Sequence, residues 1–213
     1  MKTILAFGDS LTFGADADNG SRHAYEDRWP TALERGLGGK ARVIAEGLGG
    51  RTTVFDDFAA AADRNGARVL PTLLASHSPL DLVIIFLGTN DLKPYINGSA
   101  FGAVMGVKRL VEIVRTYPYD RKATVPQVVI VSPPLAGPTN HPDLGPMFEG
   151  KIAESQKFAP LYKRMAAELG CGFFDAAPVT KATPFDGIHL DAANTSPSPI
   201  ALVLAASRWM PSN

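Results

Sequence analysis

Short apolar runs that end at turn residues limit what this chain can fold into. Runs of this kind span residues 4–7, 41–45, 80–87 and 125–131, and a weaker one spans residues 171–174. Most are rich in Val, Ile or Phe, and Gly, Asp, Ser or Pro follows them directly or after one residue. This pattern is typical of buried parallel strands. The sequence therefore predicts five strands.

Segments with helical periodicity lie between the runs. Asp27 is placed to cap a helix over residues 28–36 that has Pro30 in its first turn. The apolar residues at 69–74 form one helical face, and Pro71 would have to lie in the first turn of that helix.

The next two helical segments are longer. Residues 100–115 place their large apolar side chains on one stripe, and residues 148–169 form a long helix that Pro160 is expected to interrupt. Strands that alternate with helices predict a parallel sheet with right-handed crossovers. The proline-rich stretch 132–145 fits either a pocket wall or a rigid surface connection.

Composition narrows the class of protein. The 213 residues fit one domain over 1–213, and 21 basic residues balance 21 acidic ones. With a net charge of zero, the chain has no excess positive charge to attract nucleic acid or an anionic membrane. The same balance permits copies of the chain to associate.

Cys171 is the single cysteine, so neither an intrachain disulfide nor a metal site built on several thiolates can form. We interpret it as a small buried residue at a strand start. The N-terminal apolar segment is too short for a secretion signal, and no apolar run approaches the ~18 residues of a membrane span. These features favour a cytoplasmic protein with no membrane contact, no metal and no cofactor.

Ser10 follows the first apolar run within Gly8-Asp9-Ser10. Ligands bind outside the carboxyl ends of the strands in open α/β sheets, so Ser10 stands where a nucleophile would stand. The same three residues also fit an ordinary turn in which Ser10 caps the next segment.

Polar and glycine residues follow the second and third runs. Gly47, Gly49 and Gly50 could form a phosphate loop, an oxyanion donor or a plain turn, although neither the Walker nor the dinucleotide pattern is present. The Asn90 amide could donate to an oxyanion, and Asp91 could simply cap a helix.

Asp186 and His189 are three residues apart, so the carboxylate can orient the imidazole as a catalytic triad requires. Taken alone, the pair also fits an incidental loop. Among the other histidines, His23 and His77 fit surface or loop positions, whereas His141 is a candidate for lining a pocket.

Together these motifs resemble a known family. FGDSLT, GGRT, GTND and DGIH are similar, in this order, to the four sequence blocks of the SGNH hydrolases, also called the GDSL lipase/esterase family. The blocks run from Phe7 to His189, which is most of the chain. The resemblance implies a flavodoxin-like three-layer α/β/α fold with a central five-stranded parallel sheet.

The resemblance also implies roles for single residues. Ser10 would be the nucleophile, His189 its base and Asp186 the partner of His189. The oxyanion hole would comprise the Ser10 backbone, Gly50 and Asn90, with Gly47 and Gly49 competing for the glycine position.

Further segments resemble the arylesterase/acyltransferase branch: DRW (27–29), EGL (46–48), RTT (51–53), PLDLVII (79–85), VSPP (131–134) and FEG (148–150). That branch comprises bacterial enzymes that cleave short acyl esters, some of which pass the acyl group to alcohols or hydrogen peroxide. Members assemble into homo-oligomers whose contacts narrow the active-site entrance, so the resemblance implies a homo-oligomer.

The C-terminal segment 194–213 departs from the family pattern. Family members run into a final amphipathic helix, but Pro197 and Pro199 break a helix there. A short helix over residues 200–209 is still expected. The departure affects the C-terminal packing and the oligomer contacts, and it leaves the triad intact.

We therefore expect a serine esterase that hydrolyses short-chain aryl or alkyl esters through an acyl-enzyme, with a small acyl ester as its partner. Apolar candidates to line the pocket and exclude water are Phe13, Met147, Phe148 and Ile188, which also fit ordinary core positions. A carbohydrate acetyl-esterase or an acyl thioesterase would use the same residues. A non-catalytic binding domain on this fold is the alternative from another class.

Overall fold

Five parallel strands form the centre of the protein. The computed structural model describes residues 1–18 and 20–195. The strands lie in the order β2-β1-β3-β4-β5, and every neighbouring pair is parallel. They are β1 (Lys2–Gly8), β2 (Ala41–Gly47), β3 (Leu82–Phe86), β4 (Gln127–Ser132) and β5 (Gly172–Asp175). Each apolar run of the sequence is therefore a strand, as predicted.

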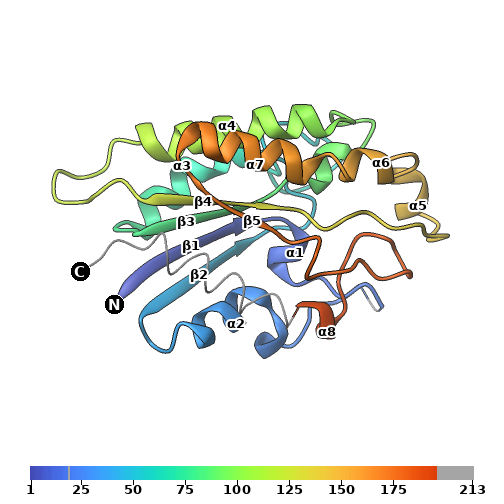
Figure 1. Ribbon diagram of the computed structural model, residues 1–213, viewed down its shortest axis with the longest axis horizontal. Helices are drawn as coiled ribbons and strands as arrows, with labels where there is room; N and C mark the ends of the chain where they lie inside the picture. The colour runs from blue at the N-terminus through green and yellow to red at the C-terminus, as the bar shows by residue number, and fades with distance from the viewer. Residues whose placement is uncertain (19, 196–213) are drawn as a thin grey trace.

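Helices cover both faces of the sheet and give the predicted three layers (Figure 1). One face carries α3 (Gly66–His77), α4 (Ala100–Thr116), α6 (Ile152–Ser155) and α7 (Phe158–Leu169). The other face carries α2 (Trp29–Gly36) and α8 (Ala192–Thr195). Shorter elements are α1 (Ser10–Phe13), α5 (Leu144–Met147) and the 3-10 turns η1 (Tyr25–Asp27) and η2 (Thr89–Leu92).

Two apolar cores lie on opposite faces of the sheet. Along β3, Leu82 and Ile84 belong to the core beneath α2, whereas Val83 and Ile85 belong to the core beneath α3, α4 and α7. Side chains of a strand alternate between faces, so an uninterrupted apolar run supplies both cores. This double burial explains why the strands could be found from the sequence.

The apolar stripe predicted for residues 100–115 is confirmed in α4. The Ser99 hydroxyl caps the helix by accepting a hydrogen bond from the Gly102 N–H at 2.9 Å. The stripe faces the sheet and is buried throughout: it comprises Val104, Val107, Leu110, Val111 and Val114.

The starts of α2 and α3 differ from the predictions. Asp27 does not cap α2, because it lies within η1, and Arg28 occupies the cap position without a side-chain hydrogen bond. Pro71 lies inside α3 and not in its first turn. The reason is an earlier cap: the Asn65 side chain accepts a hydrogen bond from the Ala67 N–H at 3.1 Å and starts the helix before the apolar face begins.

Residues 148–169, predicted as a long helix interrupted near Pro160, contain two helices, α6 and α7, which begin at Ile152 and Phe158. The break lies between Ser155 and Phe158, before Pro160. Pro160 falls in the first turn of α7, where a backbone N–H has no helical acceptor, so the proline is tolerated there. The interruption predicted near Pro160 is therefore present, and the proline itself lies in the first turn of the second helix.

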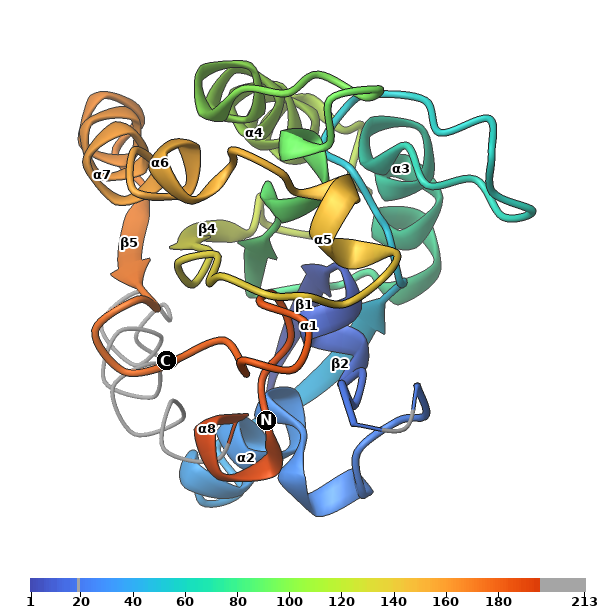
Figure 2. The same cartoon turned by 90° about the vertical axis from the view of Figure 1, so that its right-hand side faces the viewer.

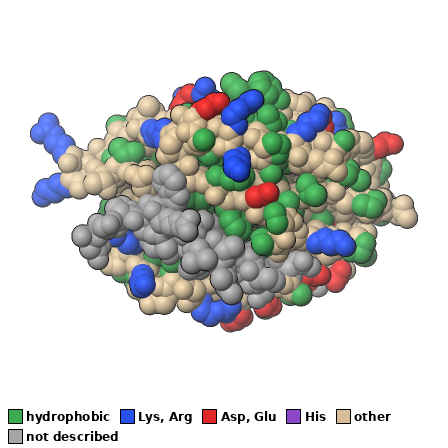
Figure 3. All heavy atoms as spheres, viewed as in Figure 1, with side chains coloured by type: hydrophobic (Ala, Val, Ile, Leu, Met, Phe, Trp, Pro, Cys, Tyr) green, Lys and Arg blue, Asp and Glu red, His purple; other side chains and the backbone are tan. Residues whose placement is uncertain are grey.

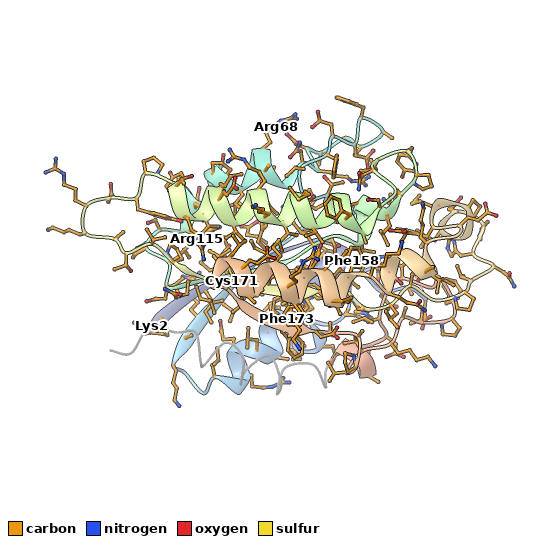
Figure 4. The ribbon with its side chains drawn as sticks, turned by 45° about the horizontal axis from the view of Figure 1, so that its top comes forward. Lys2, Arg68, Arg115, Phe158, Cys171 and Phe173 are labelled. Atoms are coloured by element: carbon orange, nitrogen blue, oxygen red, sulfur yellow. The ribbon has the colours of Figure 1, made fainter. Side chains whose placement is uncertain are left out.

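Cys171 is buried directly before β5, as predicted. The Arg115 guanidinium at the end of α4 lies 3.4 Å from its Sγ atom through Nη2, and the two side chains meet in Figure 4. Burial raises the pKa of the Cys171 thiol, and the Arg115 charge opposes that rise. Cys171 therefore joins α4 to β5 as a packing residue.

Basic, acidic and apolar side chains are interspersed over the face shown in Figure 3. Among residues 1–18 and 20–195, no helix is both long and apolar enough to cross a membrane. The helix expected over residues 200–209 and the breaks expected at Pro197 and Pro199 lie outside the described residues.

We expect Gly47→Ala to lower the free energy of unfolding by about 1–3 kcal/mol, as overpacked sites do. A Cβ atom at Gly47 would lie 2.1 Å from the Phe13 backbone nitrogen, so α1 would have to move. Urea unfolding followed by circular dichroism measures the change. Gly49→Ala is the matched control, because its Cβ would meet no atom within 4 Å. Equal destabilisation by both variants would contradict the prediction.

Candidate active site

Ser10 is the first residue of α1, and the turn from β1 fixes its position. The Asp9 carboxylate caps α1 by accepting a hydrogen bond from the Leu11 N–H at 3.0 Å. Gly8 is required at the end of β1, because a Cβ there would lie 2.0 Å from the Thr12 Oγ1 atom. Figure 2 looks onto this edge of the sheet, where the carboxyl ends of the strands meet α1, α5 and the segment after β5.

The structure brings Ser10, His189 and Asp186 into hydrogen-bond contact. The Ser10 hydroxyl lies 2.9 Å from His189 Nε2, and His189 Nδ1 lies 2.6 Å from Asp186 Oδ2. The second Asp186 oxygen accepts hydrogen bonds from the backbone N–H groups of Ile188 and His189, each at 2.9 Å. Ser10 from the start of the chain and the Asp186–His189 pair from its last part thus form one hydrogen-bonded line.

Asp186 is buried and is held in its ionised form. Burial alone would raise its pKa, but the hydrogen bonds from His189 and from the Ile188 N–H outweigh burial and keep the pKa below the ordinary value. An ionised carboxylate at Nδ1 places the imidazole proton there and leaves the Nε2 lone pair facing the serine. The arrangement suits proton transfer from Ser10.

Backbone and amide donors adjoin the serine. Gly49, Gly50 and Asn90 line the same cavity as Ser10, whereas Gly47 lies within β2 and packs on α1. Gly50 has φ of 80°, which favours glycine, whereas neither Gly47 nor Gly49 has a positive φ. Within the described part of the chain, no protein group accepts a hydrogen bond from the Gly50 N–H.

Buried polar groups hold the Asn90 amide in place. Its Nδ2 atom donates to the Arg51 carbonyl at 3.1 Å and lies 3.4 Å from an Asp9 carboxylate oxygen. The side chain is 5% exposed, so its orientation is set by these buried partners. Asn90 and Gly50 therefore border the cavity in which a substrate carbonyl would lie.

A cavity of about 390 Å³ opens above Ser10 and His189. Three of the apolar candidates line it: Met147, Phe148 and Ile188. The fourth, Phe13, does not, which corrects the prediction. Its ring lies 4.2 Å from the Arg22 guanidinium, because the end of α1 directs it toward that side chain and away from the cavity.

The remaining histidines have distinct environments. His141 lines the cavity as predicted, and the end of the proline-rich stretch therefore forms part of its wall. His23 lies in a loop, as predicted, but not at the surface, because it is buried and its Nε2 lies 2.9 Å from the Leu190 carbonyl oxygen. His77 at the end of α3 contacts the Glu46 carboxylate at 2.8 Å.

Four charged or polar residues of the cavity were missed by the sequence analysis: Asp16, Arg64, Lys93 and Tyr95. The Arg64 guanidinium lies so close to Gly50 that a Cβ there would be 2.5 Å from its Cζ atom. The only indication in the sequence that Lys93 belongs to the site is its position three residues after Asn90.

Asp91 does not cap a helix, which excludes the alternative raised for it. It is buried beneath the site, where its carboxylate accepts hydrogen bonds from the Thr53 N–H at 3.1 Å and from the Thr53 hydroxyl. Burial raises the pKa of Asp91 to about 7 and that of the neighbouring Asp9 to about 6. Both carboxyls therefore favour the protonated form more than an exposed aspartate does.

Serine and histidine in contact at the carboxyl edge of a parallel sheet are typical of ester hydrolases on α/β folds. Residues 6–194 match the GDSL-like Lipase/Acylhydrolase family, and the chain belongs to this family. Its α/β architecture is the SGNH hydrolase fold, which confirms the fold implied by the resemblance.

Three solved structures are closely similar to the chain. A carbohydrate acetylesterase family member from Sinorhizobium meliloti is 51% identical, with a TM-score of 0.96, and the match covers 98% of this chain and 99% of that one. A protein from Agrobacterium tumefaciens, provisionally named an arylesterase, is 51% identical, with a TM-score of 0.93 and coverage of 99% and 100%. The M. smegmatis aryl esterase is 38% identical, with a TM-score of 0.92 and the same coverage.

No match was found among curated proteins. The family and the structures show that the chain is a carboxylic ester hydrolase of the arylesterase-like kind. This finding sets aside the non-catalytic binding domain.

We expect Asp91→Asn to gain stability relative to the wild type as the pH rises from about 4 to about 7. The carboxyl titrates near 3.8 when unfolded and at about 7 when folded, so the folded wild type binds the proton more tightly. Folding free energy is therefore lost as the pH rises through this interval, whereas asparagine does not ionise. Urea unfolding at several pH values measures the difference.

Asp120→Asn at an exposed position is the control and should show no such trend. A stability difference between Asp91→Asn and the wild type that stays constant from pH 4 to pH 7 would show that Asp91 does not titrate in this interval.

Proposed function

We propose that the protein is a serine esterase that hydrolyses short-chain aryl or alkyl esters through an acyl-enzyme. Ser10 acts as the nucleophile, His189 as the general base and Asp186 as the group that orients the histidine. The observation that carries the proposal is the continuous line of hydrogen bonds from Ser10 Oγ through His189 to Asp186. Family membership supports the same chemistry.

In the first half of the reaction, His189 Nε2 removes the Ser10 proton as Oγ bonds to the ester carbonyl carbon. The developing oxyanion accepts hydrogen bonds from the Ser10 N–H, the Gly50 N–H and the Asn90 amide. One such donor is typically worth ~3 kcal/mol. His189 then gives its proton to the alcohol oxygen as the acyl–oxygen bond breaks, which leaves Ser10 acylated.

In the second half, His189 activates the acceptor that releases the acyl group. Water gives hydrolysis, and an alcohol or hydrogen peroxide gives acyl transfer through the same steps. The apolar side chains of Met147, Phe148 and Ile188 around the cavity disfavour bulk water near the acyl-enzyme. We therefore include acyl transfer in the proposal as a second outcome of one mechanism.

We expect Ser10→Ala to lower kcat/KM for 4-nitrophenyl acetate by at least ~10³-fold without unfolding the protein, because no other nucleophile replaces the hydroxyl. Initial rates and circular dichroism on the same samples test this. Ser76→Ala, at an exposed position of α3, is the matched control and should retain full activity. Full activity of a folded Ser10→Ala variant would overturn the mechanism.

Acetylated carbohydrates are the second candidate substrates, because the Sinorhizobium meliloti structure at 51% identity is named a carbohydrate acetylesterase family member. We expect acetate release from aryl acetates to exceed release from acetylated sugars, since Met147, Phe148 and Ile188 offer an apolar surface to an aryl ring. Parallel measurement of acetate from phenyl acetate and from acetylated xylose decides between them. A higher kcat/KM on the sugar would make the carbohydrate esterase the better assignment.

A further inference from the structure

Lys93 is a buried lysine in the wall of the catalytic cavity. It follows η2 directly, and its side chain is part of the lining that also includes Ser10 and Asn90. The residue is 5% exposed. Its backbone is fixed by a hydrogen bond from its N–H to the Asn90 carbonyl at 3.2 Å and by another from the Ile96 N–H to its own carbonyl at 2.9 Å. The lysine is thus held in place beside an oxyanion donor.

The ammonium group of Lys93 has no hydrogen-bond acceptor or ion-pair partner in the parts of the chain that the structure describes. Its Nζ lies 5.9 Å from the centroid of the Phe148 ring. A cation–π contact attracts the charge but leaves the three N–H donors unsatisfied. Nζ does not belong to the fully buried polar atoms that lack a partner, so the ammonium group is accessible from the cavity, where a ligand can supply the acceptor.

The neighbouring cation in the same wall is already paired. Arg64 Nη1 lies 2.7 Å from the Asp57 carboxylate, whereas Lys93 lies beyond ion-pair distance of that group. Burial and the Arg64 charge lower the pKa of Lys93, and the charges of Asp57, Asp9 and Asp91 oppose that change. Of these two cations, only Arg64 has a carboxylate within ion-pair distance among the described residues.

The acidic residues of the lining do not neutralise this lysine. Asp186 is hydrogen-bonded to His189, and Asp16 lies within 3.9 Å of the His23 ring. Phe148 adjoins the ammonium group, and Met147 and Ile188 add further apolar side chains to the same lining. Apolar side chains beside a cation that has no ion-pair partner fit a ligand with an apolar body and an anionic end.

We propose that Lys93 binds a carboxylate carried by the substrate, so that the preferred substrates are esters with an apolar body and a negative charge. This inference rests on the proposed esterase function. The carboxylate would belong either to the acyl part, as in a monoester of a dicarboxylic acid, or to the alcohol part, as in the acetate ester of a hydroxybenzoic acid. Both place the same anionic group in the cavity above Ser10.

The test compares anionic esters with neutral ones of the same size. The first pair, 4-nitrophenyl monoadipate and 4-nitrophenyl hexanoate, places the charge on the acyl part. The second pair, 4-acetoxybenzoate and methyl 4-acetoxybenzoate, places it on the alcohol part. The readout is the ratio of kcat/KM for the anionic ester to kcat/KM for the neutral one, which cancels changes that affect both esters equally.

We expect Lys93→Met to lower this ratio by at least ~10-fold for one of the two pairs, as loss of a hydrogen bond to a charged group does. The affected pair identifies the half of the substrate that carries the charge. Lys93→Arg keeps the charge and should retain most of the ratio. Lys108→Met, on the exposed face of α4, removes one positive charge elsewhere and should leave the ratio unchanged.

An unchanged ratio in both pairs overturns the inference. If the rates on neutral and anionic esters fall equally, the ratio is also unchanged, and Lys93 would then stabilise the reaction itself. Wild-type inhibition provides a test that needs no variant: benzoate should bind at least ~10-fold more tightly than benzamide, and equal inhibition contradicts the inference. Failure of the proposed function itself would be distinct, because neutral esters would then show no turnover that depends on Ser10.

Discussion

A buried polar network beneath the cavity joins the loops that follow β1, β2 and β3. The Asn90 amide donates to the Arg51 carbonyl, and Arg51 Nη1 in turn donates to the Gly8 carbonyl at 2.8 Å. Asp91, which follows β3, also accepts hydrogen bonds from Thr53, which follows β2. Three loops that each follow a separate strand are thereby locked together, and the positions of the serine, glycine and asparagine depend on this connection.

The network also carries an energetic cost that the apolar cores must offset. Asp9 is 1% exposed and has a pKa raised to about 6 by burial, so its ionised form opposes folding at neutral pH. Burial likewise lowers the pKa of Arg51 to about 10. Buried charged groups with shifted pKa values are typically concentrated where ligands bind. The strands and the inner faces of α4 and α7, in contrast, are packed with apolar side chains.

The sequence contained most of the fold because its signals are local. Strands buried on both faces read as continuous apolar runs, and the motifs around Ser10 and Asn90 follow such runs directly. Features that depend on contacts between residues far apart in the sequence could not be predicted from local patterns. The His23 ring contacts the carbonyl of the distant Leu190, and Phe13 turns toward Arg22 and away from the cavity. The role of Lys93 in the wall follows only from the folded arrangement.

The separation of Ser10 from His189 has a consequence for the order in which the protein becomes complete. The two residues that must meet are 179 positions apart, and all five strands lie between the start of the chain and the loop that carries His189. During synthesis all five strands and Ser10 are therefore made before His189. In the proposed mechanism, Ser10 gains its general base only when the last part of the described chain has been made and has folded against α1.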